Sequence, residues 1–113
     1  MVRRTDIILD EIMAAIDGVE SAVTERGLLA LDSDWLLQRG VERGIEIISE
    51  AVRHLPEELL ATRPDMPWRE IKAIGNRIRH EYHRVSPKVI RSVVVDELPV
   101  LRVAIEALRG VGQ

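Results

Sequence analysis

The sequence predicts an all-α protein: an up-and-down four-helix bundle with a short extra helix or turn and a kinked last helix. Apolar residues recur at steps of three and four in four segments, which is the period of a helix buried along one face. Glycine and proline mark the ends of these segments, and no segment favours a strand over a helix. The 113 residues suit one domain, so we expect a single domain over residues 1–113.

The first two helices follow from their apolar stripes. The first is expected over residues 5–26, with Thr5 as its cap and Gly27 as its stop. After a connector, Asp32 or Ser33 is expected to cap the second helix. The positions predicted to face the core are Ile8, Ile12, Ala15, Val19 and Val23, then Leu37, Val41, Ile45, Ile48, Val52 and Leu55, and the second helix ends near the last of these.

Two features of the second helix point to neighbours. Gly44 lies inside it and costs about 1 kcal/mol of helix propensity, which a close crossing by another helix would explain. Ile47, Ala51 and His54 form a second, partly apolar edge. That edge is wider than one intramolecular neighbour requires, so it indicates a partner.

Prolines divide the rest of the chain. Pro56 starts a short turn or helix, and Pro67 opens a third helix that runs to about Tyr82. Trp68, the first residue of that helix, is expected to anchor it in the core.

The fourth helix begins at Ser86, a predicted cap, and runs to about Gly110. Pro99 within it should kink the helix or split it in two. Residues 93–95 are consecutive valines that alone resemble a strand, but the helical period around them outweighs this. The apolar stripe of this helix is Ile90, Val94, Leu98, Leu101, Ile105 and Leu108.

Composition excludes several classes of protein. The chain has no cysteine, so disulfides and thiolate metal sites are excluded, which suits a cytoplasmic location. No apolar run reaches the ~18 residues of a membrane span, and no apolar region follows the basic N-terminus as in a secretory signal. The net charge of −3 argues against general affinity for nucleic acids.

The charge is nevertheless unevenly spread. Residues 69–91 contain seven basic and two acidic residues, while the remainder is acidic. A basic segment on an acidic body suits a local anionic ligand such as an RNA strand or a nucleotide. The plainer alternative is a solvated helix face that happens to be basic.

The most informative stretch runs from Asn76 to Tyr82, at the end of the third helix. At 100° per residue, Asn76, Arg77 and His80 fall on one face, together with Arg69 and with Arg84 beyond the stretch. The opposite, apolar face comprises Ile71, Ile74, Ile78 and Val85, with Tyr82 near it.

This face suits phosphodiester chemistry without a metal or cofactor. His80 would serve as general base or acid on a ribose 2′-hydroxyl, and an arginine would stabilise charge on phosphorus. The plainer alternatives are a solvated His80, an interhelical packing role for Tyr82 and an ordinary polar position for Asn76. His80 and His83 are a weak zinc signal, and there is no phosphate-binding glycine loop.

Charged residues of the second helix are expected to form intrahelical ion pairs: Arg39, Glu42, Arg43, Glu46, Glu50 and Arg53.

These residues resemble a known family. Residues 67–71, Pro-Trp-Arg-Glu-Ile, and residues 76–82, Asn-Arg-Ile-Arg-His-Glu-Tyr, are similar to the signature region of HepT-like proteins. These belong to the HEPN group (higher eukaryote and prokaryote nucleotide-binding). Residues 47–51, Ile-Ile-Ser-Glu-Ala, resemble the family as well, so the likeness covers nearly the whole chain.

The resemblance implies the toxin of a bacterial toxin–antitoxin pair. Such toxins are ribonucleases that act as homodimers, with the motif at the two-fold interface forming a composite cleft. The implied partner is an MntA-like nucleotidyltransferase antitoxin, which transfers AMP from ATP onto the motif tyrosine. By this likeness Tyr82 is the modified residue and His80 the catalytic histidine. AMP would add negative charge and bulk beside the RNA cleft.

One departure concerns the motif arginine, which four to six residues separate from the histidine in the family that the sequence resembles. Positions 73–75 here are Ala73, Ile74 and Gly75. Arg77 is the first candidate to replace that arginine because it shares the face of His80, and Arg79 is the second. Asn76, Arg69 and Arg84 are the candidate substrate-binding residues.

Three functions are therefore open. The first is an endoribonuclease toxin with His80 and Arg77 at a dimeric groove. The second is a catalytically silent helical partner of a nucleotidyltransferase, which binds nucleotide or presents Tyr82 for modification. The third is a dimeric bundle without a ligand, whose basic helix has no salt-dependent affinity for RNA.

Overall fold

The computed structural model describes residues 4–81 and 86–111, and within them all regular secondary structure is helical. The predicted all-α fold class is confirmed. Along the chain the elements are α1 (Thr5–Arg26), the 3₁₀ helix η1 (Leu28–Asp32), α2 (Trp35–Arg53), the short α3 (Glu57–Leu60), α4 (Trp68–Glu81), α5 (Pro87–Ser92), the π-helical η3 (Val93–Glu97) and α6 (Leu98–Val111).

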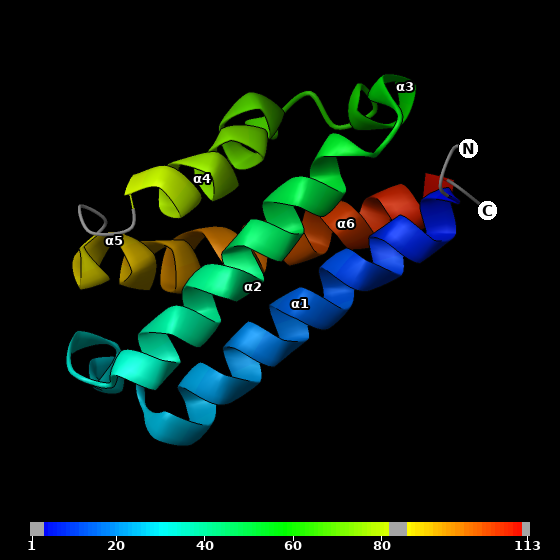
Figure 1. Cartoon of the computed structure of the whole chain (residues 1–113). Helices are drawn as coiled ribbons and strands as arrows, with labels where there is room; N and C mark the ends of the chain where they lie inside the picture. The colour runs from blue at the N-terminus through cyan, green and yellow to red at the C-terminus, as the bar shows by residue number, and fades with distance from the viewer. Residues whose placement is uncertain (1–3, 82–85, 112–113) are drawn as a thin grey trace.

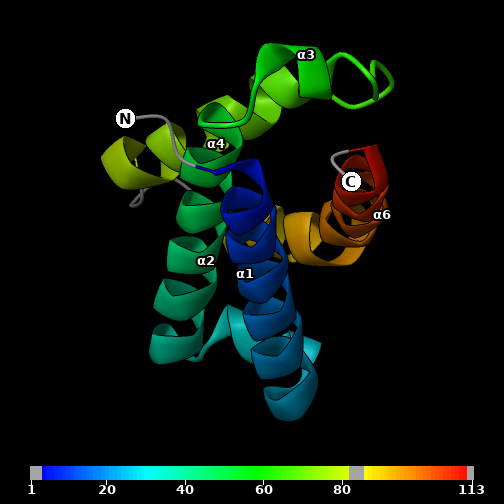
Figure 2. The same ribbon diagram turned by 90° about the vertical axis from the view of Figure 1, so that its right-hand side faces the viewer.

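The first two long helices form the centre of the bundle. Figure 1 shows α1 and α2 side by side and antiparallel, with α4 packed along α2. The run α5–η3–α6 returns along the bundle, and its α6 part packs against α1. Figure 2, turned by 90°, shows α6 on the α1 side and α4 on the α2 side. The candidate residues of α4 are therefore held mainly through α2.

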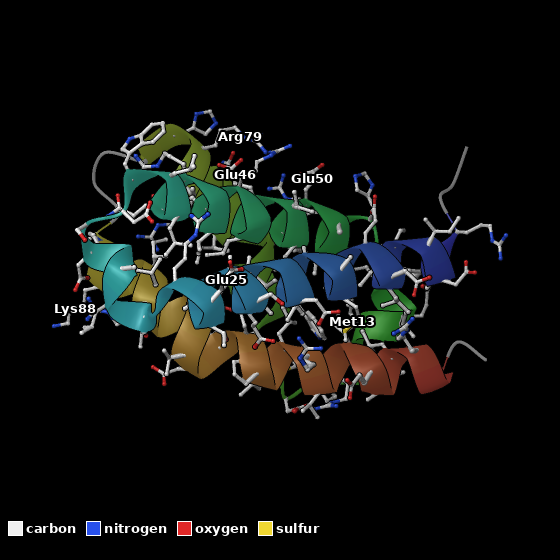
Figure 3. The ribbon with its side chains drawn as sticks, turned by 90° about the horizontal axis from the view of Figure 1, so that it is seen from below. Met13, Glu25, Glu46, Glu50, Arg79 and Lys88 are labelled. Carbon is white, nitrogen blue, oxygen red and sulfur yellow. The ribbon has the colours of Figure 1, made fainter. Side chains whose placement is uncertain are left out.

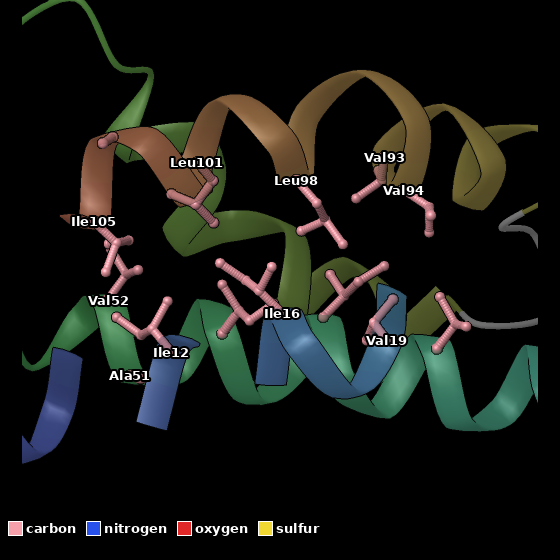
Figure 4. Close-up of a cluster of buried hydrophobic side chains, with 14 of the residues drawn as sticks. Ile12, Ile16, Val19, Ala51, Val52, Val93, Val94, Leu98, Leu101 and Ile105 are labelled. Carbon is pink, nitrogen blue, oxygen red and sulfur yellow. The ribbon is translucent and has the colours of Figure 1, made fainter. Parts of the chain in front are cut away.

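The core is almost entirely aliphatic, as the lack of phenylalanine requires. Figure 4 shows isoleucines and valines of α1 and α2 meeting valines and leucines of η3 and α6. Each such side chain contributes roughly 1.5–3 kcal/mol when it leaves water. The predicted stripes are buried, except that Ala15 is only half-buried and Ile16, one position later, is fully buried instead.

Two predicted helix caps are wrong. The N-cap of α1 is Arg4, which makes no side-chain capping bond, because Thr5 is already the first helical residue. The N-cap of α2 is Asp34, whose carboxylate accepts a hydrogen bond from the Leu37 N–H at 3.0 Å. The connector coils into η1 and delays the start of α2, so Asp32 is part of η1.

The last helix is split close to Pro99, as predicted. Proline lacks an N–H, and its ring clashes with the carbonyl four residues earlier, which here belongs to Val95 in the middle of η3. The wider π turn accommodates this conflict, and α6 continues from it. Residues 93–95 are helical and not a strand. The Ser86 cap is confirmed, since its hydroxyl accepts from the Val89 N–H.

The start of α4 is fixed by Trp68. Its indole N–H lies 3.0 Å from the carbonyl oxygens of both Leu60 and Arg63, and its ring packs against the core. Hydrogen bonds from Arg63 to Asp65 stabilise the preceding loop and lower the pKa of that carboxyl. Among the described residues no helix is long and apolar enough to cross a membrane.

Candidate functional site

The two faces of α4 differ as the helical wheel predicts. Gly75 and Ile78 are buried toward the bundle, and Ile71 and Ile74 are half-buried. From position 73 to position 80 the exposed residues are Ala73, Asn76, Arg77, Arg79 and His80. Apolar contacts thus hold the backbone from behind, while the imidazole, amide and guanidinium groups meet solvent.

His80 lies within one helical turn of two of its predicted neighbours. It follows Asn76 by four residues and Arg77 by three, and both positions are adjacent on a helix surface, with about 5–6 Å between Cβ atoms. An imidazole that can move protons is thereby paired with groups that can bind phosphate oxygens.

The groups beside His80 face two different sides of α4. Arg77 lines a groove toward α5 and η3, whereas Asn76 and Arg79 line a narrow polar crevice toward α2. Figure 3 shows Arg79 beside Glu46 of α2, with Glu50 one turn further along. Arg79 therefore lines the crevice together with Glu46 and Glu50 of α2, whereas Arg77 lines the groove on the other side of α4.

Ion pairs within α2 surround this crevice, as predicted from the sequence. Arg43 pairs with Glu46 at 3.1 Å, and Arg53 with Glu50 at 3.9 Å. Arg39 contacts both oxygens of Glu42, a carboxylate that is only 6% exposed. The two more exposed pairs contribute little to stability individually, but they hold Glu46 and Glu50, the carboxylates that line the crevice beside α4.

The groove on the other side of α4 has a volume of about 460 Å³. Its floor is apolar, and its edge carries Arg77 with three carboxylates, Glu70, Asp96 and Glu97. Val89 and Val100, which also line it, are 44% and 54% exposed. The groove therefore leaves apolar surface open directly beside one of the candidate catalytic residues.

The remaining predicted site residues lie elsewhere. Arg69 is exposed at the start of α4, eleven residues before His80, or about 16 Å along the helix axis. Tyr82 and Arg84 fall outside the described residues. Within the described part of the chain no group of three His, Asp or Glu side chains could hold a metal ion.

Gly75 stands at one of the positions where the resemblance implies an arginine, and a long side chain does not fit there. Gly75 is buried, and a Cβ built on it would lie 2.7 Å from both Cβ and Oγ of Ser49. The backbone of Glu46 is also near, with its Cα 3.4 Å from that Cβ. A long side chain at position 75 therefore has no room while Ser49 and α2 stay where they are.

Ser49 has a role at this site that the sequence reasoning did not assign. Its hydroxyl donates to the Lys72 carbonyl oxygen at 3.0 Å and accepts from the Gly75 N–H at 3.1 Å. A serine on the apolar face of a helix was the available signal, because a buried hydroxyl needs partners. Its pairing with a glycine on another helix could not be read from spacing.

Comparison with known proteins gives consistent matches. Residues 12–108 match the family model described as Ribonuclease HepT-like. The chain is 31% identical over 101 residues to "Probable ribonuclease HepT" of Thermococcus cleftensis, covering 89% of this chain and 92% of the relative. It is 37% identical over 68 residues to a candidate RNase of Caldanaerobacter subterraneus, covering 60% of this chain and 61% of the relative. The search of solved structures gave no significant match.

Proposed function

Since the chain belongs to the HepT-like ribonuclease family, we propose that it is a metal-independent endoribonuclease and the toxin of a toxin–antitoxin pair. One observation carries this proposal: His80 is exposed on the same helical turn as Arg77, on a helix held rigidly from behind. This arrangement supplies a proton-transfer group and a phosphate-binding group on one wet surface.

The proposed reaction is an attack by the ribose 2′-oxygen on the adjacent phosphorus. His80 takes the proton from the 2′-hydroxyl, the bond from phosphorus to the 5′-oxygen breaks, and that oxygen receives a proton as it leaves. The products are a 2′,3′-cyclic phosphate and a 5′-hydroxyl. Arg77 stabilises the negative charge that builds on the phosphoryl oxygens, and Asn76 helps to position the strand.

We further propose that the enzyme is a homodimer with the cleft at its two-fold seam. The apolar groove beside Arg77 supports this, because a second copy seated there would cover exposed valines. An isologous contact would also bring two copies of His80 and Arg77 to one seam. The two imidazoles of such a cleft could share the roles of base and acid.

Neutralisation by an MntA-like nucleotidyltransferase completes the proposal, with Tyr82 as the residue that receives AMP. Tyr82 follows His80 by two residues. A phosphodiester-linked nucleotide there would place negative charge close to the site that binds the RNA backbone. Modification of Tyr82 would thereby repel the substrate and obstruct the cleft.

The test is His80→Ala, assayed for cleavage of single-stranded RNA in the presence of EDTA. We expect the wild type to cut and to leave cyclic phosphate ends, and the variant to lose at least about 100-fold in rate. His54→Ala is the matched control, because His54 is also exposed but caps the C-terminal end of α2, with its Nε2 3.3 Å from a carboxylate oxygen of Glu50. Equal cleavage by the wild type and His80→Ala would refute the assignment of His80.

One specific observation favours a second function: a buried glycine, Gly75, occupies one of the positions where the resemblance implies the motif arginine. If Arg77 does not replace that arginine, the chain is a silent partner that binds RNA or nucleotide and presents Tyr82. Incubation with an MntA-like nucleotidyltransferase and ATP then adds the mass of AMP to the wild type but not to Tyr82→Phe, while no RNA is cut. Cleavage that depends on both His80 and Arg77 would exclude this second function.

A further inference from the structure

The crossing of α2 and α4 is unusually close at one point. Gly75 of α4 meets Ser49 of α2, which is only 2% exposed, and a Cβ at position 75 would come within 2.7 Å of the serine side chain. Only a glycine allows the two helices to approach this far. The nearest comparison is Gly44, which accepts the side chain of Val19 where α1 crosses α2.

The contact at Gly75 differs from that at Gly44 because it includes hydrogen bonds into the backbone of α4. The Ser49 hydroxyl inserts between the Lys72 carbonyl oxygen and the Gly75 N–H, at 3.0 and 3.1 Å. Arg53 Nε donates to the same Lys72 carbonyl oxygen at 3.1 Å. Three side-chain bonds from α2 thus hold one turn of α4, and backbone bonds fix both its translation and its rotation.

That turn directly precedes the candidate site. Asn76 follows Gly75 in sequence, Arg77 is two residues on, and His80 lies a little more than one turn further. A rotation or slide of α4 at Gly75 would therefore move all three groups together. Catalytic groups must be held within about 0.5 Å, and a shift of about 1 Å can cost a hundred-fold in rate.

We infer that Ser49 and Gly75 form a positioning pair that sets the register of α4 on α2, and so aims Arg77 and His80 at the RNA. The inference rests on the proposed function. In this inference Gly75 has a structural role where the resemblance implies a catalytic arginine. Because glycine has no side chain, the Ser49 hydroxyl can reach the backbone of α4. Neither residue touches the substrate, so the effect is on the placement of others.

The experiment measures kcat and KM for RNA cleavage in Gly75→Ala, Ser49→Gly and the double variant Ser49→Gly/Gly75→Ala. We expect Gly75→Ala to lower kcat about ten- to a hundred-fold with KM within about two-fold, because the basic surface that binds RNA remains. The double variant should have a kcat close to that of Ser49→Gly alone, because without the serine side chain the new methyl group at position 75 meets no clash.

Gly44→Ala separates positioning from loss of stability. It creates a comparable clash, but at the crossing of α1 and α2 and not against α4. Its kcat per folded molecule should stay within about two-fold of the wild type, even where its melting temperature falls as far as that of Gly75→Ala. An equal loss of kcat in both variants at matched stability would overturn the inference.

The outcomes also separate this inference from the proposed function. If the wild type cleaves RNA, an unchanged kcat in Gly75→Ala, or a kcat of the double variant far below that of Ser49→Gly alone, refutes only the positioning pair. A wild type that cuts no RNA refutes the proposed function. In that case amide hydrogen exchange along α4 tests the contact. Exchange should be faster than in the wild type in both Gly75→Ala and Ser49→Gly, and exchange that is unchanged in both variants overturns the inference.

Discussion

Two glycines of α2 lie in very different surroundings, so that packing requires a glycine at only one of the two positions. Gly44 is buried, and a Cβ there would collide with the Val19 side chain of α1. Gly40, one turn earlier, is exposed and would have no atom within 4 Å of an added Cβ. The same residue is thus required by packing at one position and merely costs helix propensity at the other.

These two positions give a matched prediction in one helix. Gly44→Ala should destabilise the fold by about 1–3 kcal/mol, because the added methyl group forces α1 and α2 apart. Gly40→Ala should stabilise it by about 0.5–1 kcal/mol, because alanine loses less entropy in a helix. Urea unfolding followed by circular dichroism measures both, and an equal effect of the two substitutions would contradict the crossing at Gly44.

The residue scale is also where prediction from sequence was least precise. Asp32, Ser33 and Asp34 all have capping side chains, and spacing alone could not select Asp34. The selection depends on η1, whose formation is decided by where Leu31 is buried in the core. Similarly, Ala51 was assigned to an edge for a partner but is 3% exposed and belongs to the buried cluster of Figure 4.

At the scale of elements the sequence was a better guide. Apolar periodicity gave every long helix, and Pro99 correctly predicted the break near it, since both signals act locally. The relation of α4 to its neighbours could not be predicted in the same way. Its approach to α2 depends on Gly75 and Ser49, which are 26 positions apart and carry no signal of each other.

The attachment of α4 also explains how its exposed face keeps its orientation. Trp68 fixes the first turn through two carbonyl oxygens, and Ser49 fixes the turn that ends at Gly75. The last described turns carry Arg77 and His80. They are held by the buried side chain of Ile78 and by the contacts of Trp68 and Gly75 earlier in the helix. The candidate site is therefore a surface feature whose geometry is determined by buried residues earlier in the same helix.

For the whole molecule, long-range ion pairs close the bundle on the side away from α4. Arg102 of α6 donates hydrogen bonds to Glu20 and Asp17 of α1, and both raise the pKa of its guanidinium. Arg109 of α6 pairs with Asp10 of α1 in the same way. Between α4 and α6 there is instead an apolar groove, lined by residues of both helices and edged by Arg77 and three carboxylates.

This asymmetry leads to a prediction about assembly. If a second copy occupies the groove, Val100→Asp should weaken the dimer, because it places a carboxylate against apolar surface and beside Glu97. The monomer should keep its fold, since Val100 is 54% exposed. Sedimentation velocity over a range of concentrations should show a dissociation constant raised at least about ten-fold, which corresponds to about 1.4 kcal/mol.

Ile7→Asp is the control for this change. Ile7 is 48% exposed on α1 and does not line the groove, so the same gain of charge and loss of apolar surface should leave the dimer intact. RNA cleavage measured on the same samples should fall with the dimer in Val100→Asp and be restored at high protein concentration, because a composite cleft needs both copies. A wild type that sediments as a monomer would refute the proposed dimer. A Val100→Asp variant that cuts RNA at the full rate as a monomer would show that one copy of His80 and Arg77 is sufficient for cleavage.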